Sequence, residues 1–345
     1  MVDIKSVKSR LPELDILRVI AAVFVLLYHF TFREPLIHHI PPGTFPSLDI
    51  FTRYGFLGVQ LFFIISGFVI LMSAEKRSAK TFIASRAKRI CPALWISCTL
   101  TFTLTLLFGA PIYHPTWSQY FINMTLLSDI LREYPIDGAY WSIFVEIKFY
   151  LFIFLVLIFK GIKKIELIYF IWILAVTFFT ILPGDQDKNL NFLLGSYAPY
   201  FAMGSIFYLW WQNRLSKISY ATFLIAYILT ILEGNHQISI LNENLHQAYY
   251  SAWIYNLTIA AFLAIFFLIL RGPIQVKENQ ITLKLGLLTY PLYLVHQYIG
   301  VIIMKGIGYS TSETLSVLIA TTLVIGIAYL VLSVETLLTR KFWPI

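Results

Sequence analysis

The sequence predicts an all-α membrane protein that crosses the bilayer about ten times. Of its 345 residues, 58% are hydrophobic and only 13% are charged, whereas a soluble domain is about 45–50% apolar and about 25% charged. The mean hydropathy of the chain is +0.75. Apolar stretches of the ~17–25 residues that a spanning helix needs recur along its whole length. Together these observations exclude a soluble globular fold.

Ten apolar stretches are long enough to be spanning helices. We place them at 14–33, 57–74, 92–110, 141–159, 165–183, 192–211, 217–233, 249–270, 284–304 and 314–338. We find no internal repeat and no loop long enough for another domain. Residues 1–345 are therefore expected to be a single transmembrane domain.

The basic residues predict which helix ends face the cytoplasm. Nineteen Lys and Arg lie on the side of the two termini, whereas the other side has five: Arg33, Arg53, Arg132, Lys188 and Lys305. Because loops rich in Lys and Arg stay inside, both termini are expected to be cytoplasmic. The net charge of +8 then indicates contact with anionic lipid and not with nucleic acid. We expect the bacterial inner membrane as the location.

The first span contains two ionisable residues, Arg18 and His29. Such residues are rare and costly within a bilayer, so they suggest a functional site. Eleven residues at ~100° each complete about three turns, which puts both side chains on one helix face. Arg18 has the alternative of reaching back to the headgroups, and His29 that of a hydrogen-bonded core residue. If His29 is catalytic, its near-neutral pKa suits a general base that takes a proton from a hydroxyl.

Two motifs near the cytoplasmic side also have two interpretations each. Ser66 and Gly67 are small residues amid large ones in the second span, which indicates close helix packing or a channel wall. Arg86 and Arg89 are spaced i, i+3 and share a helix face. They either anchor the helix at the cytoplasmic membrane surface, as the positive-inside rule predicts, or bind phosphate groups with their planar guanidinium groups.

The fourth and ninth spans carry the remaining candidates. Trp141 fits an interfacial belt, and Glu146 lies one or two turns deeper, as half of an ion pair or as part of an active site. Tyr290 and Pro291 precede His296, and Pro291 frees a carbonyl that needs protein or water beside it. A lone structural histidine is the alternative for His296. The other histidines lack metal-ligand spacing, so no metal and no bound cofactor are expected.

Taken together, the motifs resemble the acyltransferase-3 family of membrane O-acyltransferases. The resemblance rests on Leu14-Asp15-x-Leu17-Arg18 with His29, Gly58-Val59 with Phe62-Phe63-x-Ile65-Ser66-Gly67-Phe68, Phe82-x₃-Arg86-x₂-Arg89-Ile90-x-Pro92, Trp141-Ser142-x₂-Val145-Glu146 and Tyr290-Pro291-x-Tyr293-Leu294-x-His296. The five motifs keep the family's order over nearly the whole chain. We expect the chain to lack the extracytoplasmic esterase-like domain of some relatives.

The resemblance implies transfer of an acyl group, usually acetyl from acetyl-CoA as co-substrate, to a hydroxyl of a cell-surface carbohydrate or related acceptor. It suggests three sets of residues: His29 and Glu146 for catalysis, Arg18, Arg86, Arg89 and Ser66 for the donor, and Trp141, Tyr290 and His296 for the acceptor. We expect these groups to meet in one cavity that is open to the donor from the cytoplasm.

Two other functions fit the same composition. A transporter of a lipid-linked sugar or polysaccharide precursor would share the helix count and the inward charges, but it more often shows repeats and paired broken helices. A relative that binds without chemistry is the second alternative, and the intact Arg18, His29 and Glu146 argue against it.

Overall fold

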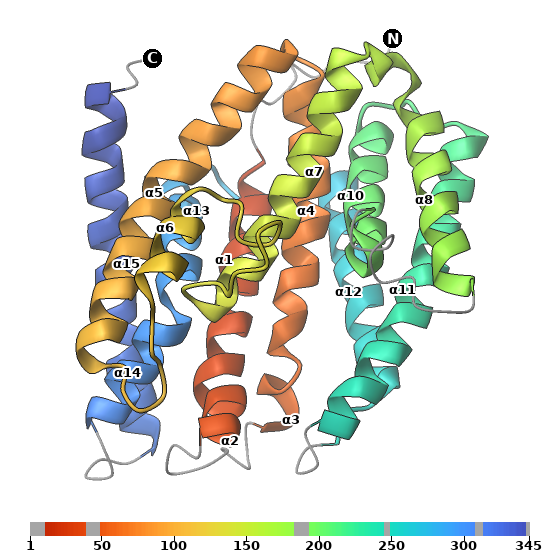
Figure 1. The fold of residues 1–345 in the computed structure, drawn as a ribbon. Coiled ribbons are helices and arrows are strands. Elements are labelled where there is room, and N and C mark those ends of the chain that lie inside the picture. The colour runs from red at the N-terminus through yellow and green to blue at the C-terminus, as the bar shows by residue number, and fades with distance from the viewer. Residues whose placement is uncertain (1–10, 39–48, 183–192, 245–248, 308–312, 343–345) are drawn as a thin grey trace.

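The computed structural model describes residues 11–38, 49–182, 193–244, 249–307 and 313–342. In these ranges all regular elements are helices, and the long ones stand side by side in one bundle (Figure 1). Within the same ranges, eight helices are long and apolar enough to cross a membrane, or nine if a bent pair counts as one span. The prediction of an all-α, multi-pass membrane protein is confirmed.

Eight of the predicted spans coincide with single long helices. These are α1 (Pro12–Tyr28), α4 (Gly58–Ala74), α5 (Ala79–Phe108), α7 (Trp141–Ile158), α8 (Ile165–Ile181), α11 (Lys217–Asn244), α12 (Ala252–Arg271) and α15 (Glu313–Phe342). Helix α5 begins well before the predicted start at 92, because the Ser78 hydroxyl accepts a hydrogen bond from the Thr81 N–H at the helix start. Pro92 lies inside this helix instead of marking its beginning.

The sixth predicted span is shorter than expected. Its helix, α10 (Ala198–Trp211), has 14 residues, which is about 21 Å of helix against a hydrocarbon core of about 30 Å. It packs along α4 at very close range. A Cβ atom on Gly67 would lie 2.1 Å from the Phe201 carbonyl oxygen, and one on Gly204 would lie 1.9 Å from that of Ile64. The close helix packing predicted at Gly67 is therefore confirmed.

The ninth span is broken at His296. Helices α13 (Gln280–Val295) and α14 (Gln297–Ile307) meet there at an angle of 69°. Pro291 lies within α13, several residues before the bend. His296, at the break, is buried in the protein, with 1% of its surface exposed.

The first span is also irregular, at His29. Helix α1 ends at Tyr28 and continues as a π-helical turn over His29–Arg33, followed by α2 (Glu34–His38). Such π-turns are rare and often occur at functional sites. Both histidines of the predicted site thus lie where a spanning helix departs from α geometry.

The shorter elements complete the fold. They are α3 (Asp49–Thr52), α6 (Trp117–Met124) and the 3₁₀ turns Gly55–Leu57, Gly138–Tyr140, Gly161–Lys164 and Gly195–Tyr197. Helix α1 is central in the bundle and packs on α4 and α13, while α15 lies at one edge (Figure 1). We call the end at which α5 begins and α15 finishes the arginine end. The opposite end is the one with α2 and α3 (Figure 1).

Candidate active site

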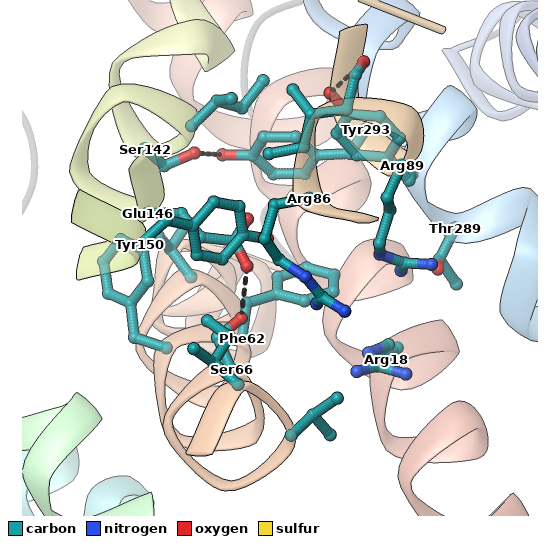
Figure 2. Close-up of a pocket in the computed structure, with 17 residues that line it drawn as sticks. Arg18, Phe62, Ser66, Arg86, Arg89, Ser142, Glu146, Tyr150, Thr289 and Tyr293 are labelled. Atoms are coloured by element: carbon teal, nitrogen blue, oxygen red, sulfur yellow. Dashed lines mark hydrogen bonds between the residues drawn. The ribbon is translucent and has the colours of Figure 1, made fainter. Parts of the chain in front are cut away.

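A cavity near the arginine end brings three predicted donor residues together. Arg18 from α1 and Arg86 and Arg89 from α5 line it, and their guanidinium groups lie on one side of the same space (Figure 2). We call this the arginine cavity; its volume is about 80 Å³. The Arg18 side chain is 17% exposed and points into the cavity, so it does not extend to the headgroups as the alternative interpretation requires.

The three arginines differ in how they are held. Arg18 Nη1 donates to Asp15 Oδ1 at 3.1 Å, and Arg86 Nη2 donates to Ser73 Oγ at 3.1 Å. Arg89 makes no hydrogen bond or ion pair with any residue in the described ranges. A guanidinium presents five donors in a planar fork that matches phosphate and carboxylate. Arg89 is therefore the arginine with the most free capacity for an anion.

Ser66 and Glu146 both line the same cavity and are hydrogen-bonded to each other. Ser66 Oγ donates to Glu146 Oε1 at 2.7 Å (Figure 2). Lys148, a partner considered from sequence, instead pairs with Asp129 at 2.6 Å. The Glu146 carboxylate thus shares the cavity of the arginines and has no contact with His29. The structure therefore places the predicted catalytic carboxylate beside the arginines that were predicted for the donor.

A second, larger cavity adjoins the first one. It has a volume of about 560 Å³ and lies between α5, α13 and α15. Arg89 and Tyr290 line both cavities, and the larger one is also lined by two more cations, Lys88 and Arg340, and by one carboxylate, Glu335. We call it the α15 cavity. Arg89, the arginine with free donors, thus borders both cavities.

His29 is held by a carboxylate that the sequence analysis missed. The imidazole Nδ1 lies 3.0 Å from Glu34 Oε1, and Glu34 is completely buried. Because a carboxylate only accepts hydrogen bonds, Nδ1 carries the proton and the Nε2 lone pair is left available as a base. The His29 side chain keeps 11% of its surface exposed. This pair has the arrangement of an oriented general base.

Glu34 is itself held from several sides. Gln297 Nε2 donates to its Oε1 at 2.9 Å, Arg33 Nη1 donates to the same oxygen, and His38 Nε2 lies 3.1 Å from its Oε2. Every one of these neighbours carries a hydrogen-bond donor. The carboxylate is therefore compensated and fixed in position despite its burial.

His296 lies between the arginine cavity and His29. Its ring centroid is 5.1 Å from that of His29. Its Nδ1 donates to the Tyr293 carbonyl at 2.7 Å, and its buried Nε2 has no hydrogen-bond partner among the described residues. The Tyr293 hydroxyl, paired with Ser142 Oγ at 2.7 Å, lines the arginine cavity (Figure 2). We call His29, Glu34 and His296 the imidazole site.

One expectation about the site needs correction. His29 does not line the arginine cavity, so the predicted groups do not share a single open space. Tyr293 and His296 stand between them, because α13 turns into α14 at that point. His29 is nevertheless 9% exposed as a whole residue and faces protein, not lipid.

Two residues predicted to position the acceptor lie away from His29. Trp141 packs on Tyr197 and Phe63 and lines neither cavity. Tyr290 lies between the two cavities with Arg89, and its hydroxyl donates to the Ile90 carbonyl at 3.2 Å. Of the three residues predicted for the acceptor, only His296 is beside His29.

Glu34 escaped the sequence analysis for a geometric reason. Residues five apart on an α-helix are separated by about 500°, so they do not share a face. In the π-turn the Glu34 N–H bonds to the His29 carbonyl, five residues back, which brings the two side chains together. A search for a carboxylate at i+5 from the intramembrane histidine would have found it.

The fold and these sites define a multi-pass membrane enzyme with a cationic cavity beside an oriented imidazole. The sequence pattern of the acyltransferase-3 family, described as an acyltransferase domain, matches residues 11–333. The chain belongs to this family, and it is a membrane acyltransferase. The resemblance seen in the five motifs is confirmed.

Several relatives carry related names. ORF330 of Acidianus two-tailed virus, named as a proposed acetyltransferase, is 28% identical over 294 residues, which are 83% of this chain and 82% of that protein. Peptidoglycan O-acetyltransferase OatA of Listeria monocytogenes is 24% identical over 240 residues, 61% of this chain and 36% of OatA. O-acetyltransferase OatA of Staphylococcus aureus is 29% identical over 171 residues, 43% of this chain and 25% of OatA. The chain thus spans about a third or less of the OatA proteins. No solved structure matches it.

Proposed function

We propose that the protein transfers an acetyl group from acetyl-CoA to a hydroxyl of a cell-surface carbohydrate. The observation that carries the proposal is the placement of two kinds of group: three guanidinium groups around one cavity, and an imidazole with a free nitrogen directly behind its wall. The O-acetyltransferase names of relatives support acetyl as the group and oxygen as its destination. The bacterial inner membrane, with both termini cytoplasmic, fits the distribution of basic residues.

The donor would bind from the arginine end. Coenzyme A carries phosphates on a bulky nucleotide and the thioester on a thin pantetheine arm. The α15 cavity has the larger volume, about 560 Å³, and it shares Arg89 and Tyr290 with the narrow arginine cavity, which extends to Tyr293. Phosphates held by Arg89 and Arg86 would leave the arm free to extend toward His296.

The chemistry would centre on His29. Its Nε2 takes the proton of the acceptor hydroxyl while the hydroxyl oxygen attacks the thioester carbonyl carbon. The carbon–sulfur bond then breaks, and the proton passes from the imidazolium to the departing thiolate of coenzyme A. Glu34 stabilises the imidazolium that exists between the two proton transfers. The unpartnered Nε2 of His296 would accept a hydrogen bond from a neighbouring hydroxyl of the acceptor and so orient the attacking one.

The test separates donor binding from transfer. Purified wild-type protein and His29→Ala are compared for thermal stabilisation by acetyl-CoA, with free acetate as the control ligand, and for transfer of labelled acetyl to native membranes. We expect acetyl-CoA to stabilise both proteins, and transfer only in the wild type. His236→Ala removes an exposed histidine of α11 and should behave as wild type. Wild-type transfer by His29→Ala would refute the mechanism, and absence of acetyl-CoA binding would favour the transporter interpretation.

A further inference from the structure

A third cavity, at the opposite end of the bundle, has no part in the steps above. It has a volume of about 240 Å³ and lies between the end of α5, the following loop, α6 and the beginning of α14. Its side chains combine aromatic rings with hydroxyl, amide and imidazole groups: Thr105, Tyr113, His114, Gln119, Tyr134 and Tyr298. We call it the tyrosine cavity.

The lining of the tyrosine cavity has the chemistry that a sugar ring requires. The Tyr113 and Tyr298 rings are stacked, with centroids 3.9 Å apart and 17° between their planes. The Tyr113 hydroxyl is buried without a hydrogen-bond partner among the described residues, a state that costs about 1–3 kcal/mol and that a ligand hydroxyl would relieve. Flat rings suit the C–H face of a sugar, and the polar groups suit its hydroxyls.

The size of the cavity limits the ligand to about one ring. Drug-sized ligands occupy pockets of roughly 300–1,000 Å³, and this cavity is smaller at about 240 Å³. It is accessible from outside, because Tyr134 is 79% exposed and His114 is also exposed. A single residue of a longer glycan can therefore enter while the rest stays in solvent.

The tyrosine cavity is built on the groups that hold the catalytic base. The Tyr113 ring lies 5.8 Å from the His38 ring, and His38 Nε2 lies 3.1 Å from Glu34 Oε2. Tyr298 directly follows Gln297, which donates to Glu34. A ligand in this cavity is thus one layer of side chains away from the His29–Glu34 pair.

The wall beside Glu34 is fixed by Asp137. The Asp137 carboxylate accepts hydrogen bonds from the N–H groups of Tyr298, at 3.0 Å, and Ala139, at 2.9 Å. Burial raises the pKa of Asp137 to about 7, while these two backbone hydrogen bonds act in the opposite direction. Gly138 leaves no room for a Cβ atom, which would lie 2.7 Å from Gln297 Nε2. The tight packing holds Gln297 and Tyr298 in register with the imidazole site.

We propose that the tyrosine cavity is the acceptor subsite and binds one sugar ring, one layer of side chains away from the imidazole site. This inference rests on the proposed acetyl transfer. It adds to that proposal the entry of the acceptor from the end opposite to the donor. It also assigns Tyr113, Tyr134 and Tyr298 as the residues that contact the carbohydrate.

The experiment measures how cavity variants respond to soluble acceptors. Methyl glycosides of glucose, galactose, mannose and N-acetylglucosamine are offered as acceptors with labelled acetyl-CoA, and phosphatidylglycerol vesicles serve as the lipid alternative. Tyr113→Phe removes only the unpartnered hydroxyl, and Tyr134→Ala removes an exposed ring, so both should fold. Tyr249→Ala removes an equally exposed ring (77%) that does not line the cavity, and it is the matched control.

We expect at least one glycoside to be acetylated. Its KM should rise about 3–10-fold in both cavity variants, the equivalent of one lost hydrogen bond or ring contact. The KM for acetyl-CoA should not change, and Tyr249→Ala should match the wild type. Equal glycoside KM values in all variants, acetylation of lipid only, or no acetylated glycoside would overturn the inference. In those cases acetyl-CoA binding and acetyl transfer to native membranes would still report on the proposed function, so the two failures remain distinct.

Discussion

The arginine cavity and the imidazole site differ in whether their charged side chains have partners. In the arginine cavity, Arg89 has no hydrogen-bond or ion-pair partner within the described residues, and it borders two open spaces. In the imidazole site, the buried Glu34 carboxylate is surrounded by donors from His29, Arg33, His38 and Gln297. One region keeps its charge available, and the other has its charge already neutralised.

From this difference we expect the arginine cavity to bind the donor and the imidazole site to carry out the chemical step. An arginine without a partner keeps the five donors of its guanidinium available, so an anionic ligand can gain hydrogen bonds from it. A carboxylate whose charge is balanced by neighbouring cations and donors holds the imidazole in one tautomer and one orientation. Changes in the first region should therefore alter KM for the donor, and changes in the second should alter kcat.

The largest effect should come from breaking the imidazole site alone. Glu34→Gln replaces the carboxylate by a neutral amide that cannot stabilise the imidazolium of His29. We expect kcat for acetyl transfer to fall by about 10²–10⁴-fold, the range of general-base and orienting residues. Single-turnover transfer measures kcat, and thermal stabilisation measures acetyl-CoA binding, which should stay unchanged. Glu243→Gln, an exposed carboxylate on α11, is the control. If Glu34→Gln impaired only acetyl-CoA binding, the two regions would not have separate roles in binding and chemistry.

Breaking the arginine cavity alone should have the next largest effect. Arg89→Ala removes the guanidinium shared by both arginine-end cavities. Loss of charge-assisted hydrogen bonds worth about 1.5–3 kcal/mol should raise KM for acetyl-CoA roughly 10–100-fold, with little change in kcat. Initial rates at varied acetyl-CoA concentration measure both constants. Arg271→Ala removes an arginine that stacks on Trp210 and lines neither cavity, so its KM should equal that of the wild type. An unchanged KM in Arg89→Ala would exclude this arginine from donor binding.

The close packing of α4 on α10 can be loosened without touching a residue of the arginine cavity or the imidazole site. Gly204→Ala would place a Cβ atom 1.9 Å from the Ile64 carbonyl oxygen, so the two helices must separate. Overpacking of this kind costs about 1–3 kcal/mol, and the Tm of purified protein should fall measurably. Gly326→Ala on α15 adds a methyl group with nothing within 4 Å, so its Tm should be unchanged or slightly higher. Equal Tm values for the two variants would mean that the crossing is looser than described.

We expect the smallest effect from Ser66→Ala, which tests how Glu146 is held beside the arginines of the arginine cavity. Its hydroxyl holds Glu146 at 2.7 Å, and a freed carboxylate can turn toward the guanidinium groups and compete with donor phosphate. Ser66→Ala should raise KM for acetyl-CoA about 2–10-fold, the value of one hydrogen bond. Ser239→Ala breaks a similar serine–carboxylate pair, with Glu243 on the exposed face of α11, and should leave KM unchanged. A fall in kcat without a change in KM would instead place Glu146 in the chemical step.

The spanning helices were predictable because the bilayer accepts only backbone that satisfies its own hydrogen bonds. Hydropathy alone located α4, α7, α8 and α12 to within a few residues of their observed ends. It placed the start of α5 too late, because the polar first turns of that helix lie before its apolar part. It also overestimated the length of α10, because an apolar residue can be buried in protein as well as in lipid.

The arginines of the site were predictable for a similar reason, and the carboxylate was not. Arg18 is conspicuous as a charge inside an apolar segment, and Arg86 and Arg89 are conspicuous by their i, i+3 spacing before one; all three line one cavity. Glu34 lies at the end of the first span, where a charge is unremarkable, and its pairing with His29 depends on a local π-turn. The separation of His29 from the arginine cavity depends on the bend at His296, which no local pattern encodes.

The sequence by itself determined that this chain is a helical membrane protein, which residues are costly to bury, and the family to which its motifs point. Hydrophobicity and charge act on each segment independently of the others, so these conclusions required no knowledge of the fold. The tertiary structure alone decided which side chain each carboxylate contacts: Glu34 contacts His29, and Glu146 contacts Ser66 beside the arginines. Those pairings join groups through helix irregularities and contacts between distant segments, and free energies of that kind exist only once the helices have packed.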